Sequence, residues 1–147
     1  VGEGMAGLFA DKNTPEIDRT FAEDLLSAVG KTTWVTNEDQ MHAVTAASGS
    51  SPAYFFQFLE AMQQCLIEMG LDENQSRELV QQAMLGSAKL VIENPQTALS
   101  TLRENVTSKG GTTAAALNVF NQYQFNDIIK QAMQACVARS QEMEKLF

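Results

Sequence analysis

The chain has 147 residues, of which 44% are hydrophobic and 19% charged, a composition that suits one globular unit or one domain with part of another. It carries 10 Lys and Arg against 18 Asp and Glu, giving a net charge of −8. Nucleic acids and anionic membranes require clustered basic side chains, so this balance argues against both as partners. No apolar run approaches the roughly 20 residues of a membrane span, and no signal peptide is recognisable. We therefore expect a cytoplasmic protein.

The first 36 residues predict a strand, a helix and a second strand. The strand Met5–Ala10 precedes Thr14, which we expect to cap the helix, with Pro15 at its first position. Gly30 fits the left-handed position that follows such a helix. The segment Thr32–Val35 is β-branched and aromatic, as strands are. The helix carries an apolar stripe at helical spacing, formed by Ile17, Phe21, Ala22, Leu25, Leu26 and Val29.

The segment Gly2–Gly7, GEGMAG, matches the dinucleotide pattern G-x-G-x-x-G letter for letter. That fingerprint requires a strand before it and a helix directly after it, whereas Leu8–Ala10 is short and apolar and predicts a strand. Glu3 would also face the pyrophosphate of a bound dinucleotide. We interpret these glycines as positions where backbone segments pack closely.

From Asn37 onward the apolar residues recur at helical spacing, and no strand-period segment remains. The sequence therefore predicts a mostly α protein: an all-helical domain over residues 37–147, preceded by a short strand–helix–strand over residues 1–36. The expected helices are Glu38–Ala47, broken by residues 48–51; one from Pro52 to Gly70; one that Asp72 caps and that ends before Pro95; Ala98–Arg103; Thr112–Phe120; and one from about Asp127 to Glu144.

These helices are apolar on more than one stripe. Phe55, Phe56 and Phe58 occupy neighbouring positions, so they cannot all face one inner core, and a single subunit would expose a large apolar patch. We expect a second copy of the chain to cover it. A compact monomeric bundle with an aromatic core is the alternative.

The cysteines and the single histidine show no metal-ligand spacing. Cys65 and Cys136 each lie on an apolar helical face, and no C-x-x-C motif is present, so we expect buried free thiols. His42 has no second ligand near it in sequence, which predicts a capping or core histidine. No metal site is expected.

The stretch Leu102–Asn121, LRENVTSKGGTTAAALNVFN, combines a Ser-x-Gly-Gly-Thr-Thr turn with the start of an amphipathic helix. Gly110 and Gly111 allow close backbone approach, and the first amides of a helix near Thr112 have no intrahelical acceptor. With the hydroxyls of Ser108 and Thr113, these amides would suit a small carboxylate. An ordinary helix N-cap is the other interpretation.

The whole stretch resembles the signature of pyrroline-5-carboxylate reductases. The matching positions are Leu102, Val106, Thr107, Ser108, Gly110, Gly111, Thr112, Thr113, Ala116, Leu117, Phe120 and Asn121. A second block, Ala43–Tyr54, is similar to the segment that enters the long helix of that family's dimerisation domain. The resemblance implies a helical dimerisation domain of the 6-phosphogluconate-dehydrogenase-like C-terminal type, which forms intertwined homodimers that often assemble into rings.

The resemblance also implies an activity, the last step of proline biosynthesis: NADPH or NADH reduces the cyclic imine 1-pyrroline-5-carboxylate to L-proline. It places the substrate carboxylate on Ser108, Gly110, Gly111 and Thr112. Thr113 is the implied catalytic residue, as hydrogen-bond partner of the ring nitrogen and a further substrate contact. The backbone at Val106 would meet the nicotinamide amide.

Two positions depart from many relatives, which have Pro in place of Lys109 and Gly in place of Ser51. The family also carries an N-terminal cofactor domain of about 150 residues. We expect residues 1–36 to be its C-terminal remnant, and the chain to be a fragment inactive on its own. The alternative function is a non-catalytic helical oligomerisation module.

Overall fold

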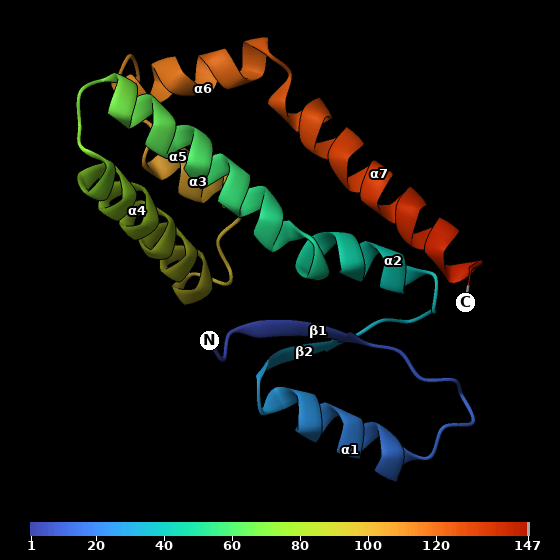
Figure 1. Cartoon of the computed structure of the whole chain (residues 1–147). Coiled ribbons are helices and arrows are strands. Elements are labelled where there is room, and N and C mark those ends of the chain that lie inside the picture. Colours follow the sequence, from blue (N-terminus) through green and yellow to red (C-terminus); the bar gives the residue numbers. More distant parts are fainter. Residues whose placement is uncertain (147) are drawn as a thin grey trace. The chain divides into compact units, whose positions relative to one another are not determined.

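The computed structural model describes residues 1–146 and divides them into two compact units (Figure 1). The first unit comprises Val1–Tyr54 together with the residues from Ile129 onward, and the second comprises Phe55–Ile128. Most of the chain is helical, with one short parallel sheet, as the sequence predicts.

The sheet belongs to the first unit. Strand β1 (Gly4–Leu8) is followed by helix α1 (Glu16–Ser27) and strand β2 (Gly30–Trp34), drawn in blue in Figure 1. The two strands pair in parallel. The predicted strand–helix–strand is confirmed, with strand boundaries one or two residues earlier than expected.

Glycines allow close backbone contacts around this sheet. Gly4 lies opposite Gly30 in the ladder, and a Cβ atom on Gly30 would overlap the Gly4 carbonyl. A Cβ atom on Gly7 would lie 2.6 Å from Cγ1 of Val44. The interpretation of the GEGMAG glycines as packing positions is therefore confirmed for Gly4 and Gly7, which lie inside a strand rather than opening a helix.

Two predictions about the ends of α1 are wrong. Gly30 is not a left-handed cap, because Ala28 ends the helix in right-handed geometry and Gly30 already begins β2. At the other end the N-cap is Pro15, with no side-chain cap. The Pro15 carbonyl accepts hydrogen bonds from the amides of Asp18 and Arg19, so backbone geometry alone starts the helix.

Only part of the apolar stripe of α1 is covered. Ala22 and Leu26 are half-buried, whereas Ile17, Phe21 and Leu25 are exposed in this chain.

The expected break at residues 48–51 is wrong. Helix α2 (Gln40–Val44) continues into one π-helical turn, η1 (Thr45–Gly49), and α3 (Ser51–Glu68) follows after Ser50. The hydroxyls of Thr45, Ser48 and Ser51 donate to carbonyls four residues earlier, at 3.0, 3.1 and 2.7 Å. These internal bonds let hydroxyl residues stay in a helical path.

The C-terminal helix α7 (Phe125–Glu144) begins in the second unit, and from Ile129 onward belongs to the first. Nδ1 of His42 lies 2.9 Å from the Ser140 hydroxyl, and its Nε2 lies 3.4 Å from Glu144. His42 is therefore a partly buried, satisfied histidine, as expected.

The second unit contains the rest of α3, then α4 (Glu73–Glu93), α5 (Leu99–Asn105), α6 (Thr112–Gln122) and the start of α7. Gly70, at φ +101°, follows α3. Asp72 caps α4 by accepting a 3.0 Å hydrogen bond from the amide of Gln75. Both boundary predictions are confirmed, because they rest on local backbone chemistry.

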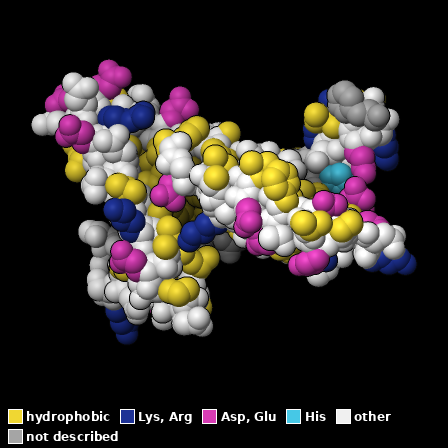
Figure 2. Space-filling model, turned by 90° about the horizontal axis from the view of Figure 1, so that it is seen from below, with side chains coloured by type: hydrophobic (Ala, Val, Ile, Leu, Met, Phe, Trp, Pro, Cys, Tyr) yellow, Lys and Arg dark blue, Asp and Glu magenta, His cyan; other side chains and the backbone are white. Residues whose placement is uncertain are grey.

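The second unit buries little of its apolar surface. Of residues 55–128, all of which the structure describes, only Ser76 and Val80 are buried. Phe58, Phe120 and Phe125 form a ring cluster, with successive centroids 6.4 and 5.2 Å apart. By contrast, Phe56 is 67% exposed. Figure 2 shows many hydrophobic side chains at the surface of one face.

The cysteine prediction is wrong in one respect. Both thiols are free, but Cys65 is exposed on α3 and Cys136 is only half-buried. Apolar spacing along a helix predicts that the apolar face is buried, but among residues 1–146 no side chain covers Cys65 on α3 enough to bury it. No helix among residues 1–146 is long and apolar enough to cross a membrane.

Candidate functional site

The stretch that sequence analysis singled out forms the connection between α5 and α6. Helix α5 ends at Asn105, and Val106 is its C-cap. The amide of Val106 and the hydroxyl of Thr107 both donate to the Arg103 carbonyl, at 3.3 and 2.6 Å. The amide of Thr107 donates to the Glu104 carbonyl at 2.9 Å. The chain thus leaves α5 in a fixed direction.

A tight turn follows. The amide of Gly111 donates to the Ser108 carbonyl at 3.0 Å, and Gly110 has φ +74°, which matches the third position of a type II turn. Lys109 occupies the second position, where Pro is common. A Cβ atom on Gly111 would overlap the Ser108 hydroxyl oxygen. The positive φ of Gly110 therefore favours glycine at that position, whereas a side chain at Gly111 would have to displace the Ser108 hydroxyl.

Helix α6 begins directly after this turn. Gly111 is its N-cap, and no side-chain hydrogen bond caps the end. The first intrahelical bond joins the amide of Ala115 to the Gly111 carbonyl, at 3.1 Å. The amides of Thr112, Thr113 and Ala114 therefore have no intrahelical acceptor. The N-cap interpretation holds for the backbone, since Gly111 occupies that position, while no Ser or Thr hydroxyl accepts a hydrogen bond from these amides.

All the candidate substrate contacts lie within this one turn and the first turn of α6. Ser108, Thr112 and Thr113 are exposed, and Gly110 and Gly111 connect them. Val106 stands on the other side of Thr107 and is 61% exposed. Among the hydrogen bonds of the described residues, none ends at the Val106 carbonyl. The arrangement offers amide and hydroxyl donors for an anion, and one carbonyl acceptor beside them.

A hollow of about 280 Å³ adjoins the loop between α5 and α6. Thr107, directly before the Ser108–Gly111 turn, and Ala114, in the first turn of α6, both line this hollow. These two residues and Leu117, which also lines it, are half-buried. Its exposed rim consists of Arg103, Glu104, Asn118 and Asn121. Sequence reasoning missed these rim residues. The signal for them was the spacing of Ala114, Leu117, Asn118 and Asn121, which places them on one face of α6.

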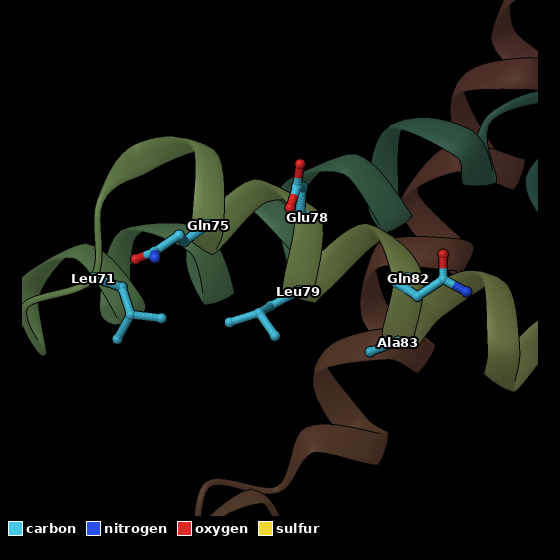
Figure 3. Close-up of a pocket in the computed structure, with 6 residues that line it drawn as sticks. All are labelled: Leu71, Gln75, Glu78, Leu79, Gln82 and Ala83. Carbon is cyan, nitrogen blue, oxygen red and sulfur yellow. The ribbon is translucent and has the colours of Figure 1, made fainter.

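A larger open groove of about 580 Å³ runs along α4 and the residue before its N-cap. In Figure 3, Leu71 and Leu79 point to one side of the helix while Glu78 points to the opposite side. None of the residues from Val106 to Thr113 lines this groove. Its size therefore does not make it the better candidate for chemistry.

A second polar cluster lies in the first unit, where Cys136 on α7 meets the start of α3. The Cys136 thiol donates to the Ser50 hydroxyl at 3.3 Å. Hydrogen bonding to Ser50, and then to Tyr54, lowers the pKa of Cys136, because both hydroxyls stabilise the thiolate. The interaction with Cys136 raises the pKa of Tyr54. Among the described residues, no three His, Cys, Asp or Glu side chains form a possible metal site.

A known family model matches most of the chain. The family model described as pyrroline-5-carboxylate reductase dimerisation matches residues 38–143. This range includes α5, the loop and α6.

Curated relatives match over the whole chain. The pyrroline-5-carboxylate reductase of Haemophilus influenzae is 75% identical over all 147 residues, which make up 54% of its own length. That of Pasteurella multocida is 65% identical over the same span, again 54% of its length. The chain therefore spans about half the length of the relatives it matches.

Solved structures show the same fold. A pyrroline-5-carboxylate reductase from Coxiella burnetii matches with a TM-score of 0.87 at 36% identity, over 93% of this chain and 51% of that one. A pyrroline carboxylate reductase from Plasmodium falciparum, solved with NADP bound, matches with a TM-score of 0.85 at 28% identity, over 97% of this chain and 53% of that one.

Proposed function

Because the chain belongs to the pyrroline-5-carboxylate reductase dimerisation family, we propose that it is the helical, substrate-binding half of an NAD(P)H-dependent reductase that converts 1-pyrroline-5-carboxylate to L-proline. Since the chain spans about half the length of its relatives, the activity is proposed for an enzyme with both halves, called here the full-length reductase. The observation that carries the proposal is the N-terminus of α6, which no side-chain hydrogen bond caps and which follows a turn with Gly110 in left-handed geometry.

The substrate is an anion with a cyclic imine. Its carboxylate would accept hydrogen bonds from the free amides at the start of α6 and from the hydroxyls of Ser108 and Thr112. Gly110 and Gly111 allow the backbone to come close enough for this contact. The helix dipole adds favourable electrostatics at the same point.

Thr113 is the proposed partner of the imine nitrogen. It follows Thr112 on α6 and is exposed, so its hydroxyl can contact a ring whose carboxylate is bound at the start of the helix. The role of this side chain is to orient the C=N bond, because much of the rate advantage of an enzyme comes from holding reacting atoms in near-attack geometry.

The cofactor would be held mainly outside this chain. Reduced nicotinamide, when bound, supplies the hydride. The free carbonyl of Val106 fits the carboxamide group of such a ring, because that group has two N–H donors. The choice between NADH and NADPH would be made by the cofactor domain, of which we propose that residues 1–36 are the C-terminal part.

A homodimer is the proposed assembly of this half, with rings of dimers as the next level. Phe55, Phe56, Met69 and Leu85 are exposed on α3 and α4 or between them, and apolar surface of this extent favours a partner. The same exposure also supports the second candidate function, a helical oligomerisation module without chemistry.

Kinetics of two loop variants distinguish these functions. In the full-length reductase, Thr113→Ala should lower kcat/KM for 1-pyrroline-5-carboxylate about ten- to a hundredfold, because one hydrogen bond to a charged or polarised group is worth about 1.5–3 kcal/mol. Ser108→Ala should act in the same direction. Thr101→Ala, on the exposed surface of α5, is the matched control and should change nothing. Wild-type kinetics in both loop variants would favour the oligomerisation module.

A further inference from the structure

The residue that attaches the candidate site to α5 is Thr107. We propose that Thr107 is a positioning residue, whose hydroxyl bond to the Arg103 carbonyl holds Val106 and Ser108 in register with the amides of α6. The inference rests on the proposed function, because it assigns this residue a part in the same reaction. Thr107 itself contacts neither substrate nor cofactor in this scheme.

Thr107 makes two hydrogen bonds to α5, and the one from its hydroxyl is the shortest between the loop and that helix. Its hydroxyl donates to the Arg103 carbonyl at 2.6 Å, and its amide donates to the Glu104 carbonyl at 2.9 Å. The neighbouring amide of Val106 shares the Arg103 carbonyl over a longer distance, 3.3 Å. The hydroxyl bond is therefore the firmest attachment of the loop to α5.

The hydrogen-bond donors and the acceptor of the proposed site are oriented by two different helices, α5 and α6, which this loop connects. The amides of Thr112 and Thr113 are oriented by α6, whereas Val106 and Ser108 are oriented by the end of α5. The turn between Ser108 and Gly111 connects the two through a single backbone bond. Because Thr107 lies between Val106 and Ser108, its two bonds fix both of these residues relative to α5.

The hydroxyl bond of Thr107 differs from similar hydroxyl bonds in the chain because it lies beyond the end of a helix and not inside one. The Ser87 hydroxyl also donates to a carbonyl four residues earlier, that of Ala83, at 2.8 Å. Ser87 lies inside α4, where the helical ladder already holds the backbone. Thr107 lies after the last residue of α5, where no ladder continues. Loss of its hydroxyl therefore loosens the loop, which keeps only the two backbone bonds from Val106 and Thr107, whereas loss of the Ser87 hydroxyl leaves the backbone in place.

Removal of the Thr107 hydroxyl should lower turnover more than affinity. Misplacement of a contact by about 1 Å can lower the rate of an enzyme roughly a hundredfold. A loosened loop displaces its contacts by less, so a smaller loss of rate is expected. In the full-length reductase we expect Thr107→Val, which keeps the side-chain shape, to lower kcat about tenfold. KM for 1-pyrroline-5-carboxylate should rise less than threefold. Thr107→Ser restores the hydroxyl and should restore kcat.

The experiment compares Thr107→Val, Thr107→Ala and Thr107→Ser with the control Ser87→Ala, by steady-state kinetics and by hydrogen exchange of the amides from Ser108 to Thr113. Faster exchange and lower kcat in the Val and Ala variants, with rescue by Ser and no change in the control, are the expected results. Wild-type kcat and exchange in a folded Val or Ala variant would overturn the role of Thr107. If the wild-type reductase does not reduce 1-pyrroline-5-carboxylate, the proposed function fails, and exchange rates that match wild type would then reject the positioning role separately.

Discussion

The amide of Gly111 donates a 3.0 Å hydrogen bond to the carbonyl of Ser108, and the two residues between them, Lys109 and Gly110, form the corner of a type II turn. Lys109 therefore stands at a position whose backbone geometry suits Pro.

Lys109→Pro should stabilise this loop. The second position of a type II turn has the φ value that Pro imposes, and the amide of Lys109 donates none of the hydrogen bonds found among the described residues. We expect a gain in the free energy of unfolding of about 0.4–1 kcal/mol, through lower entropy of the unfolded chain, measured by chemical denaturation. Lys109→Ala is the control, because it removes the charge without making the backbone more rigid. A lower stability for Lys109→Pro than for Lys109→Ala would contradict the turn assignment.

Two glycine substitutions should change stability in opposite directions. Gly86 lies inside α4, and a Cβ atom there meets nothing within 4 Å, so Gly86→Ala should stabilise the chain by about 0.5–1 kcal/mol. Gly110→Ala places a side chain at φ +74° and should destabilise it by about 1–2 kcal/mol. Thermal unfolding of both variants tests this pair, and equal shifts of the same sign would count against it.

Dimerisation should depend on the exposed face of α3. Phe56→Asp places a charge on a side chain that is 67% exposed in the single chain, and burial of that charge in an interface is strongly unfavourable. Sedimentation should show a shift from dimer to monomer or aggregate. Gln57→Asp, one position along the same helix and also exposed, is the control. A stable monomer for the unmodified chain at micromolar concentration would rule out the dimer.

The Cys136 thiol should react as a thiolate at lower pH than an ordinary cysteine. Hydrogen bonding to Ser50 lowers the pKa of Cys136, so the thiolate fraction near neutral pH is raised. Because the folded pKa is lowered, the associated stabilisation is present above the unfolded pKa and is lost as pH falls through the folded pKa.

Alkylation rates test this shift. In a Cys65→Ser background, iodoacetamide should react with Cys136 along a pH profile that Ser50→Ala moves to higher pH. Tyr54→Phe should move the profile in the same direction by a smaller amount, because Tyr54 is the second cause of the lowered pKa. An identical profile in the Ser50→Ala chain would show that the hydroxyl does not stabilise the thiolate.

The isolated chain should not bind a nicotinamide cofactor. Its only match to the dinucleotide fingerprint, Gly2–Gly7, runs into β1, where Gly4 and Gly7 serve strand and helix packing, so no glycine turn opens a helix toward a pyrophosphate. Calorimetry with NADPH should show no heat of binding. Micromolar affinity would restore the GEGMAG segment as a cofactor site.

Local signals in the sequence were sufficient for most elements. Asp72 and Gly70 mark helix boundaries through their own hydrogen bonds and backbone angles. The prediction that Gly30 is a helix cap was wrong because glycine is required there by the contact with Gly4 across the sheet. A pairing between strands leaves no local sequence pattern. The hydroxyls around Ser48 misled because they bond within the helix instead of ending it.

The candidate site was predictable only in part. The Ser108–Thr113 motif located the loop, since glycines and hydroxyl residues before a helix have a recognisable spacing. The bond from Thr107 to the Arg103 carbonyl and the hollow rimmed by Asn118 and Asn121 depend on how α5 and α6 pack. The exposure of Cys65 depends on what covers α3, which a single chain does not determine.

The π-helical turn η1 sets the rotational phase of the residues that follow it. Relative to an uninterrupted α-helix, such a turn holds one additional residue, equivalent to about 100° of rotation. Ser50 comes directly after η1, and Tyr54 lies one turn further along α3; both interact with Cys136. Deletion of one residue from Thr45–Gly49 would return the helix to regular phase and rotate both hydroxyls away from the thiol by that angle. The contact between α7 and the start of α3 therefore depends on the additional residue in this turn as well as on the side chains that form it.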